Sequence, residues 1–145
     1  NLIGRTFMPP ADCPFRTVDA ILSRDPNLGR TIIVDIHGEA TSEKVAMSRH
    51  LDGRVSAVVG THTHVQTADE RVTARGTACL TDLGMTGPKD SIIGRDAESV
   101  MSIFLKGMPA KFEVATDDVT LEGAIVEVDQ ATGKASRISR IRDPH

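Results

Sequence analysis

The stretch TIIVDIHGEA, residues 31–40, is a near-continuous apolar run that ends in a histidine and a glycine. Such a run is typical of a strand covered on both faces, as in a parallel sheet flanked by helices. A second apolar run, residues 55–59, is followed by Gly60 and then by His62 and His64. The two runs predict buried strands with histidines just beyond their carboxyl ends.

Helices are expected between these strands. A short helix over about residues 17–23 should be stopped by residues 25–27, Asp-Pro-Asn. A second helix should run over about residues 41–51, capped by Thr41 or Ser42. Together with a strand tail at the start of the chain, the first half predicts a β-α-β-α-β order. That order favours parallel strands joined by helical crossovers.

The second half of the chain predicts antiparallel strands and one further helix. We expect a hairpin over residues 71–80, followed by a helix that Asp96 caps and Gly107 ends. Strands at 112–114 and 121–128 should be joined at 116–118. A last hairpin should turn through 131–134 into Ile138. The predicted fold class is therefore α/β, β-α-β-α-β followed by antiparallel hairpins and one helix.

Bulk composition limits the classes of function. The chain has 145 residues, enough for one domain, with 3% aromatics and a net charge of −3. This charge argues against bulk nucleic-acid binding, and no apolar run reaches the roughly 20 residues of a membrane span. Cys13 and Cys79 form no CxxC pair and predict reduced thiols in the core of a cytoplasmic protein. Because residues 1–4, Asn-Leu-Ile-Gly, resemble a strand cut in the middle, we expect a C-terminal piece of a longer protein.

His37, His62 and His64 are the candidate metal ligands. Ligands of open α/β sheets bind at the carboxyl ends of the strands, and neutral imidazole commonly binds transition metals. If the chain stays extended, the side chains at positions 62 and 64 point to the same side, roughly 6.5–7 Å apart at Cα. That separation would suit two adjacent ions, which lie about 3.5–4 Å apart in two-metal hydrolases.

Other interpretations of these residues remain open. The two histidines in HTH could also be a nucleophile with a helper or plain surface residues. Asp35 could accept a hydrogen bond that fixes an imidazole tautomer, or it could be a capping or solvated residue. The remaining polar candidates are interpreted as surface or loop residues: Glu39, Glu43, His50 and His145.

Three blocks of sequence resemble a known family. DIHGEATSEK (35–44), DGRVSAVVGTHTHVQTADER (52–71) and TDLGMTGPKDSIIG (81–94) strongly resemble the YmdB-like family of calcineurin-type metallophosphoesterases. The segments NLIGRTFMPP (1–10) and PFRT (14–17) match as well. The resemblance covers essentially the whole chain, residues 1–145, but only the C-terminal part of a single metallophosphoesterase domain. The family's usual alanine after the strand-end histidine is Gly38 here.

The resemblance implies an α/β sandwich and hydrolysis of phosphodiesters, including cyclic nucleotides, by a metal-activated hydroxide. It implies two divalent transition-metal ions, iron or manganese with zinc as an alternative. His37 and His62 would bind one ion and His64 the other. The family's early Asp, Glu-Asn pair and Asn-His pair, whose histidine resembles the general acid, are absent from this sequence. No catalytic residue is therefore assigned in this chain, which we expect to be inactive alone.

Two other functions compete with this interpretation. HTHVQ (62–66) is similar to the His-x-His-x-Gln motif of histidine-triad nucleotidylyltransferases, in which His64 would attack phosphorus. That fold, however, is built on an antiparallel sheet. A non-catalytic scaffold that keeps three histidines is the third interpretation. The expected partner is a small phosphodiester or cyclic nucleotide, with no membrane, and association into a homo-oligomer stays open.

Overall fold

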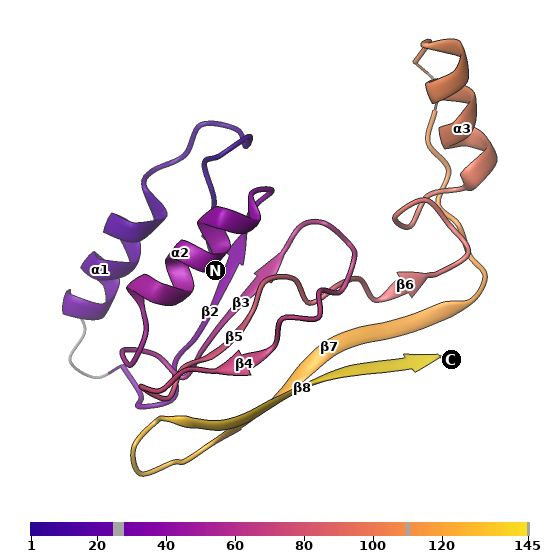
Figure 1. The fold of residues 1–145 in the computed structure, drawn as a ribbon. Coiled ribbons are helices and arrows are strands. Elements are labelled where there is room, and N and C mark those ends of the chain that lie inside the picture. Colours follow the sequence, from indigo (N-terminus) through magenta and orange to yellow (C-terminus); the bar gives the residue numbers. More distant parts are fainter. Residues whose placement is uncertain (25–27, 110, 145) are drawn as a thin grey trace.

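The computed structural model describes residues 1–24, 28–109 and 111–144. Within these residues the chain forms a five-stranded sheet, a three-stranded sheet and three helices. Two helices cover one face of the larger sheet, and a long hairpin lies along its other side (Figure 1). The third helix projects away from these layers. This arrangement confirms the predicted α/β class with added antiparallel strands.

The larger sheet has the strand order β1-β2-β3-β5-β4. Its strands are β1 (Leu2–Ile3), β2 (Ile33–His37), β3 (Ala57–Thr61), β4 (Arg71–Val72) and β5 (Ala78–Leu80). The strands β1, β2, β3 and β5 are parallel neighbours, and β4 pairs antiparallel with β5. The predicted parallel β-α-β-α-β order and the hairpin over residues 71–80 are confirmed.

Helices α1 (Pro14–Arg24) and α2 (Thr41–His50) pack on one face of this sheet (Figure 1). The core between them is aliphatic, as the scarcity of aromatic residues requires. Its buried members are Leu2, Val18, Val34, Ile36, Met47, Leu51, Val55 and Val58. Burying apolar side chains of this size stabilises the fold by about 1.5–3 kcal/mol each, so this layer holds β2 and β3 in place.

On the opposite face, strands β3 and β5 pack against the smaller sheet, whose strand order is β6-β7-β8. Ile33 of β2 is 60% exposed on this face, so the expected cover on both faces is wrong for β2. Its strands are β6 (Gly87–Pro88), β7 (Val119–Val128) and β8 (Ala135–Pro144). Residues Ala57, Ala78, Leu80, Ala135 and Ile138 form the second core. The turn between β7 and β8 falls where the sequence predicts it.

Helix α3 (Ala97–Lys106) is capped as predicted. The side chain of Asp96 accepts a hydrogen bond from the Ser99 amide at 2.8 Å, and Gly107 ends the helix in the left-handed conformation. Its apolar residues are nevertheless largely exposed, with Phe104 at 76% and Leu105 at 78%. Within the described part of the chain, no helix is long and apolar enough to cross a membrane.

Several predicted boundaries are wrong. Helix α1 begins at Pro14, whose missing amide hydrogen suits the first turn of a helix. Helix α2 has Ala40 as its N-cap with no side-chain cap, so neither Thr41 nor Ser42 caps it. The carboxylate of Glu43 instead accepts hydrogen bonds from the backbone amides of the loop that follows β1.

The predicted strand at residues 112–114 is also wrong. Val114 makes only an isolated bridge to Arg95, and β7 takes β6 as its partner instead. The pattern of three alternating residues was too short to specify a partner. Two further sequence predictions, the helix stop at residues 25–27 and the surface position of His145, lie outside the described residues.

Gly60 is expected to be irreplaceable for packing reasons. A Cβ at this position would lie 1.9 Å from the carbonyl oxygen of Thr81 and 2.7 Å from Cδ of Lys44. Gly60→Ala should therefore lower the free energy of unfolding by about 3 kcal/mol, measured by urea denaturation. Gly29→Ala is the control, because a Cβ there meets no described atom within 4 Å. Equal stability of the two variants would contradict this packing.

Candidate metal centre at the carboxyl edge of the sheet

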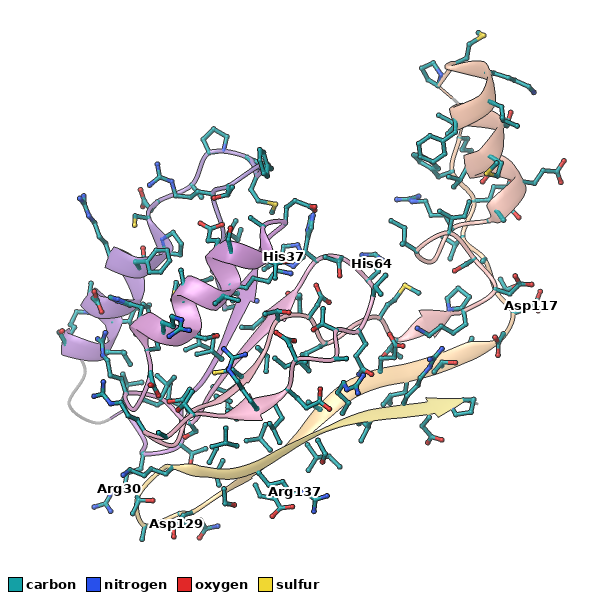
Figure 2. The ribbon with its side chains drawn as sticks, in the orientation of Figure 1. Arg30, His37, His64, Asp117, Asp129 and Arg137 are labelled. Carbon is teal, nitrogen blue, oxygen red and sulfur yellow. The ribbon has the colours of Figure 1, made fainter. Side chains whose placement is uncertain are left out.

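Two of the three candidate histidines come from neighbouring parallel strands. His37 is the last residue of β2 and lies in register with Thr61, the last residue of β3. His62 follows Thr61 directly. Figure 2 shows His37 and His64 at the same edge of the sheet, with Arg30 and Asp129 at the opposite end of the molecule. The structure therefore places the candidate residues at the carboxyl ends of the strands, where ligands of α/β sheets bind.

A chain of hydrogen bonds fixes the tautomer of His37. The Thr61 hydroxyl donates to Oδ1 of Asp35 at 2.9 Å, so its proton is already used. The same Thr61 oxygen lies 3.0 Å from Nδ1 of His37 and must accept from it. His37 therefore carries its proton on Nδ1, which leaves a lone pair on Nε2. Asp35 acts on the imidazole through Thr61 and not by direct contact.

A ring nitrogen of His62 lies against a ring nitrogen of His37. Nδ1 of His62 lies 3.1 Å from Nε2 of His37, and the ring centroids are 4.9 Å apart. The other nitrogen of His62, Nε2, lies 3.0 Å from the carboxylate of Glu39, which accepts its proton. This proton placement leaves a lone pair on Nδ1 as well. With both rings neutral, neither facing nitrogen carries a proton, so the 3.1 Å contact requires a shared cation, either a proton, which makes it a hydrogen bond, or a metal ion.

The facing nitrogens fit one metal ion as two of its ligands. With metal–nitrogen bonds near 2.0–2.1 Å, two ligand nitrogens on one ion lie about 2.8–3.4 Å apart, from octahedral to tetrahedral angles. The observed 3.1 Å falls in this range. Metal-binding histidines also donate their second ring N–H to a carboxylate or a similar acceptor, as both rings do here. Across the described residues, no three His, Cys, Asp or Glu side chains form a metal-holding group, so further donors are needed.

His64 stands apart from this pair. Its Nδ1 donates to the carbonyl oxygen of Ile93 at 2.9 Å, which leaves Nε2 as the nitrogen free to bind. His62 and His64 have positive φ angles of 127° and 64°, so the chain turns here. The expectation that an extended chain directs both side chains to the same side is therefore wrong. Non-glycine residues with such angles are costly and cluster at functional sites.

Asp82 holds the turn that carries these histidines. Its carboxylate accepts hydrogen bonds from the backbone amides of Thr63 and Gly84, each at 3.0 Å, and from the Lys44 ammonium at 2.9 Å. Burial raises the pKa of Asp82, but the bonds from Lys44 and the two amides outweigh it and keep the pKa low. Sequence reasoning missed Asp82 and Lys44, because charged residues in isolation are most often solvated. It interpreted Glu39 as a plain surface or loop residue, whereas Glu39 pairs with His62.

A cavity of about 450 Å³ lies beside His64. Its charged lining includes Lys89, Arg140, Arg142 and the nearly buried Glu122. Glu122 pairs with Lys89 and accepts a hydrogen bond from the Met85 amide at 3.1 Å. Burial raises the pKa of Glu122, and the bonds from Lys89 and Met85 lower it further than burial raises it.

The remaining sequence candidates take no part in the hydrogen bonds of His37 and His62. His50 pairs with Asp19 at 2.9 Å on the surface, as expected of a non-ligand. Cys79 is buried in the sheet as predicted, whereas Cys13 is only half-buried before α1.

The layered sheets form an α/β sandwich of the calcineurin-like phosphoesterase fold class. The model of the YmdB-like protein family matches residues 1–141. The chain belongs to the YmdB-like family, as the sequence resemblance predicts. The parallel neighbours of β3 and this membership argue against the histidine-triad alternative, whose sheet is antiparallel.

Relatives with solved structures or assigned activities agree with this membership. The chain is 50% identical over 141 residues to a 2′,3′-cyclic-nucleotide 2′-phosphodiesterase of Bacillus subtilis, covering 97% of the chain and 53% of the relative. It superposes with a TM-score of 0.92 and 40% identity on a hypothetical protein from Thermus thermophilus, covering 98% and 55% of the two chains. It superposes with a TM-score of 0.89 and 38% identity on a novel phosphatase from Mycoplasma pneumoniae, covering 98% of this chain and 51% of that one. The chain thus spans about half the length of these relatives.

Glu122 predicts a specific acid response. Because its folded-state pKa is depressed, its contribution to stability is present above the ordinary Glu value of about 4.3 and is lost as pH falls through the folded-state pKa. Glu122→Gln should lower the melting temperature at pH 7, and the gap to the parent should narrow below about pH 4. Thermal melts from pH 7 to 2.5 test this. A gap that stays constant with pH would show that the ion pair with Lys89 is not the cause.

Proposed function

We propose that the complete protein is a metal-dependent phosphodiesterase that hydrolyses phosphodiesters such as cyclic nucleotides. The supporting observation is the pair of imidazole nitrogens, Nε2 of His37 and Nδ1 of His62, which face each other at 3.1 Å with their other nitrogens already bonded. Membership of the YmdB-like family and the similarity to a cyclic-nucleotide phosphodiesterase add support for this activity.

In this proposal the chain supplies part of the ligand set for two divalent ions, iron or manganese with zinc as the alternative. His37 and His62 hold one ion, and Nε2 of His64 is directed to the second. Such ions lower the pKa of water and stabilise charge on phosphoryl oxygens. Asp35 through Thr61, and Glu39, keep the two facing imidazoles in the tautomers that expose a lone pair.

The other donors and the general acid are proposed to lie in a part of the protein outside this chain. The relatives are about twice as long, which leaves room for them. Residues 1–145 are accordingly proposed as the C-terminal part of one metallophosphoesterase domain. We expect this chain alone to hydrolyse phosphodiesters poorly or not at all. Loss of a general acid alone costs on the order of 10²–10⁴ in rate.

The experiment compares histidine variants in the complete protein. His62→Ala should lower turnover of a 2′,3′-cyclic nucleotide with Mn²⁺ by on the order of a hundredfold or more, because a reacting centre out of place costs about that much. His50→Ala is the matched control, since this histidine also pairs with a carboxylate but lies on the surface away from the edge.

The alternatives predict different results in the same assay. Normal turnover by His62→Ala would contradict the proposed site. A covalent nucleotidyl adduct on His64 would support the histidine-triad alternative, and absence of turnover and of metal binding in the complete protein would support a scaffold.

Thr61 offers a finer test of the tautomer argument. Thr61→Val keeps the shape of the side chain but removes the oxygen between His37 and Asp35. Loss of such an orienting partner should weaken Mn²⁺ binding about 10–100-fold, measured by calorimetry. Thr73→Val is the control, because it breaks a bond of the same kind to Asp52, away from the histidines. Equal affinity of the two variants would show that Thr61 does not orient His37.

A further inference from the structure

The ion pair between Lys44 and Asp82 is the most completely buried pair of charges among the described residues. The Lys44 side chain is 2% exposed and that of Asp82 is 1% exposed, with Nζ and Oδ2 2.9 Å apart. Removing two charges from water is costly, and apolar residues of similar size often stabilise a core as well or better. Stability alone therefore gives a weak reason for this pair.

The hydrogen bonds of Asp82 point to a different role. Oδ2 accepts from the amide of Thr63, the residue between His62 and His64, and Oδ1 accepts from the amide of Gly84. The backbone of Asp82 is bonded in turn to Thr67 at the other end of the same loop. The buried side chain of Asp82 thus fixes the turn at Thr63, and the backbone of Asp82 fixes it at Thr67.

This turn needs an external constraint. The φ angles of His62 and His64, 127° and 64°, lie where side chains other than glycine are rarely found. Such conformations persist only when the surrounding structure over-determines them. The bond from the Thr63 amide to Asp82 lies between the two strained residues, so it acts where the constraint is needed.

Gly60 leaves room for the path by which Lys44 reaches Asp82. A Cβ on Gly60 would lie 2.7 Å from Cδ of Lys44. The lysine therefore passes against the backbone of β3 from helix α2 to the end of β5. Its charge compensates the carboxylate at a place that water does not reach, which keeps Asp82 an acceptor for the two amides.

We propose that Asp82, neutralised by Lys44, is a positioning residue that holds the His62–Thr63–His64 turn so that Nδ1 of His62 faces Nε2 of His37. The inference rests on the proposed function in one respect, namely that these nitrogens bind metal. Asp82 itself touches neither histidine side chain and acts through the backbone of Thr63.

The test replaces both charges together, so that no charge is left buried alone. Lys44→Met/Asp82→Leu is compared with the parent in the complete protein, and Val55→Ala serves as a core variant that lowers stability without contacting the turn. In metal-free protein, amide hydrogen exchange of Thr63 and Gly84 should accelerate at least tenfold in the double variant only. Its Mn²⁺ affinity should fall about 10–100-fold, measured well below the melting temperature.

A graded variant separates positioning from packing. Lys44→Met/Asp82→Asn keeps one acceptor oxygen and should recover part of the Mn²⁺ affinity. If the leucine double variant keeps parental affinity and parental amide protection, the pair serves only the core and the proposal is overturned. If the parent binds no Mn²⁺, the proposed function fails, and the exchange of the Thr63 and Gly84 amides alone then decides whether Asp82 holds the turn.

Discussion

The parallel pairing of β2 with β3 determines where every candidate residue lies. Its register matches Ile33 with Ala57 and His37 with Thr61, so the two strands end at the same level. Apolar side chains of both strands hold this pairing by packing against α1 and α2 on one face, and Ala57 of β3 packs against β7 and β8 on the other. A shift of one residue would turn these side chains to the wrong face and separate His37 from Thr61.

Polar residues at this edge orient the histidine side chains once the strands are in place. His37 is oriented through Thr61 and Asp35, His62 through Glu39, and the turn between His62 and His64 through Asp82. Each of these bonds has its own acceptor, so one ring nitrogen of His37 and one of His62 carry a proton in a fixed position. Such support around a site is what fixes ligand geometry in metalloproteins.

Sequence patterns predicted the parts of this structure that depend on local order. The apolar runs gave β2 and β3, the glycines and Asp96 gave the ends of helices, and the strand-end histidines gave the edge of the sheet. The strand at 112–114 failed, because pairing depends on a distant partner. The roles of Lys44 and Asp82 could not be predicted from the sequence either, since the two residues are 38 positions apart and only the fold buries them together.

The facing nitrogens of His37 and His62 also explain why the proposed metal site would need donors from elsewhere. A proton on either nitrogen would turn the 3.1 Å contact into an ordinary hydrogen bond, so this pair alone suits a proton as well as a metal ion. Two imidazoles leave most positions of an ion open, and no carboxylate of the described residues joins them in a three-donor group. Additional anionic donors would favour a divalent cation over a proton, because their charge attracts the doubly charged ion more strongly. The discrimination between metal and proton therefore falls to the residues that complete the ligand set.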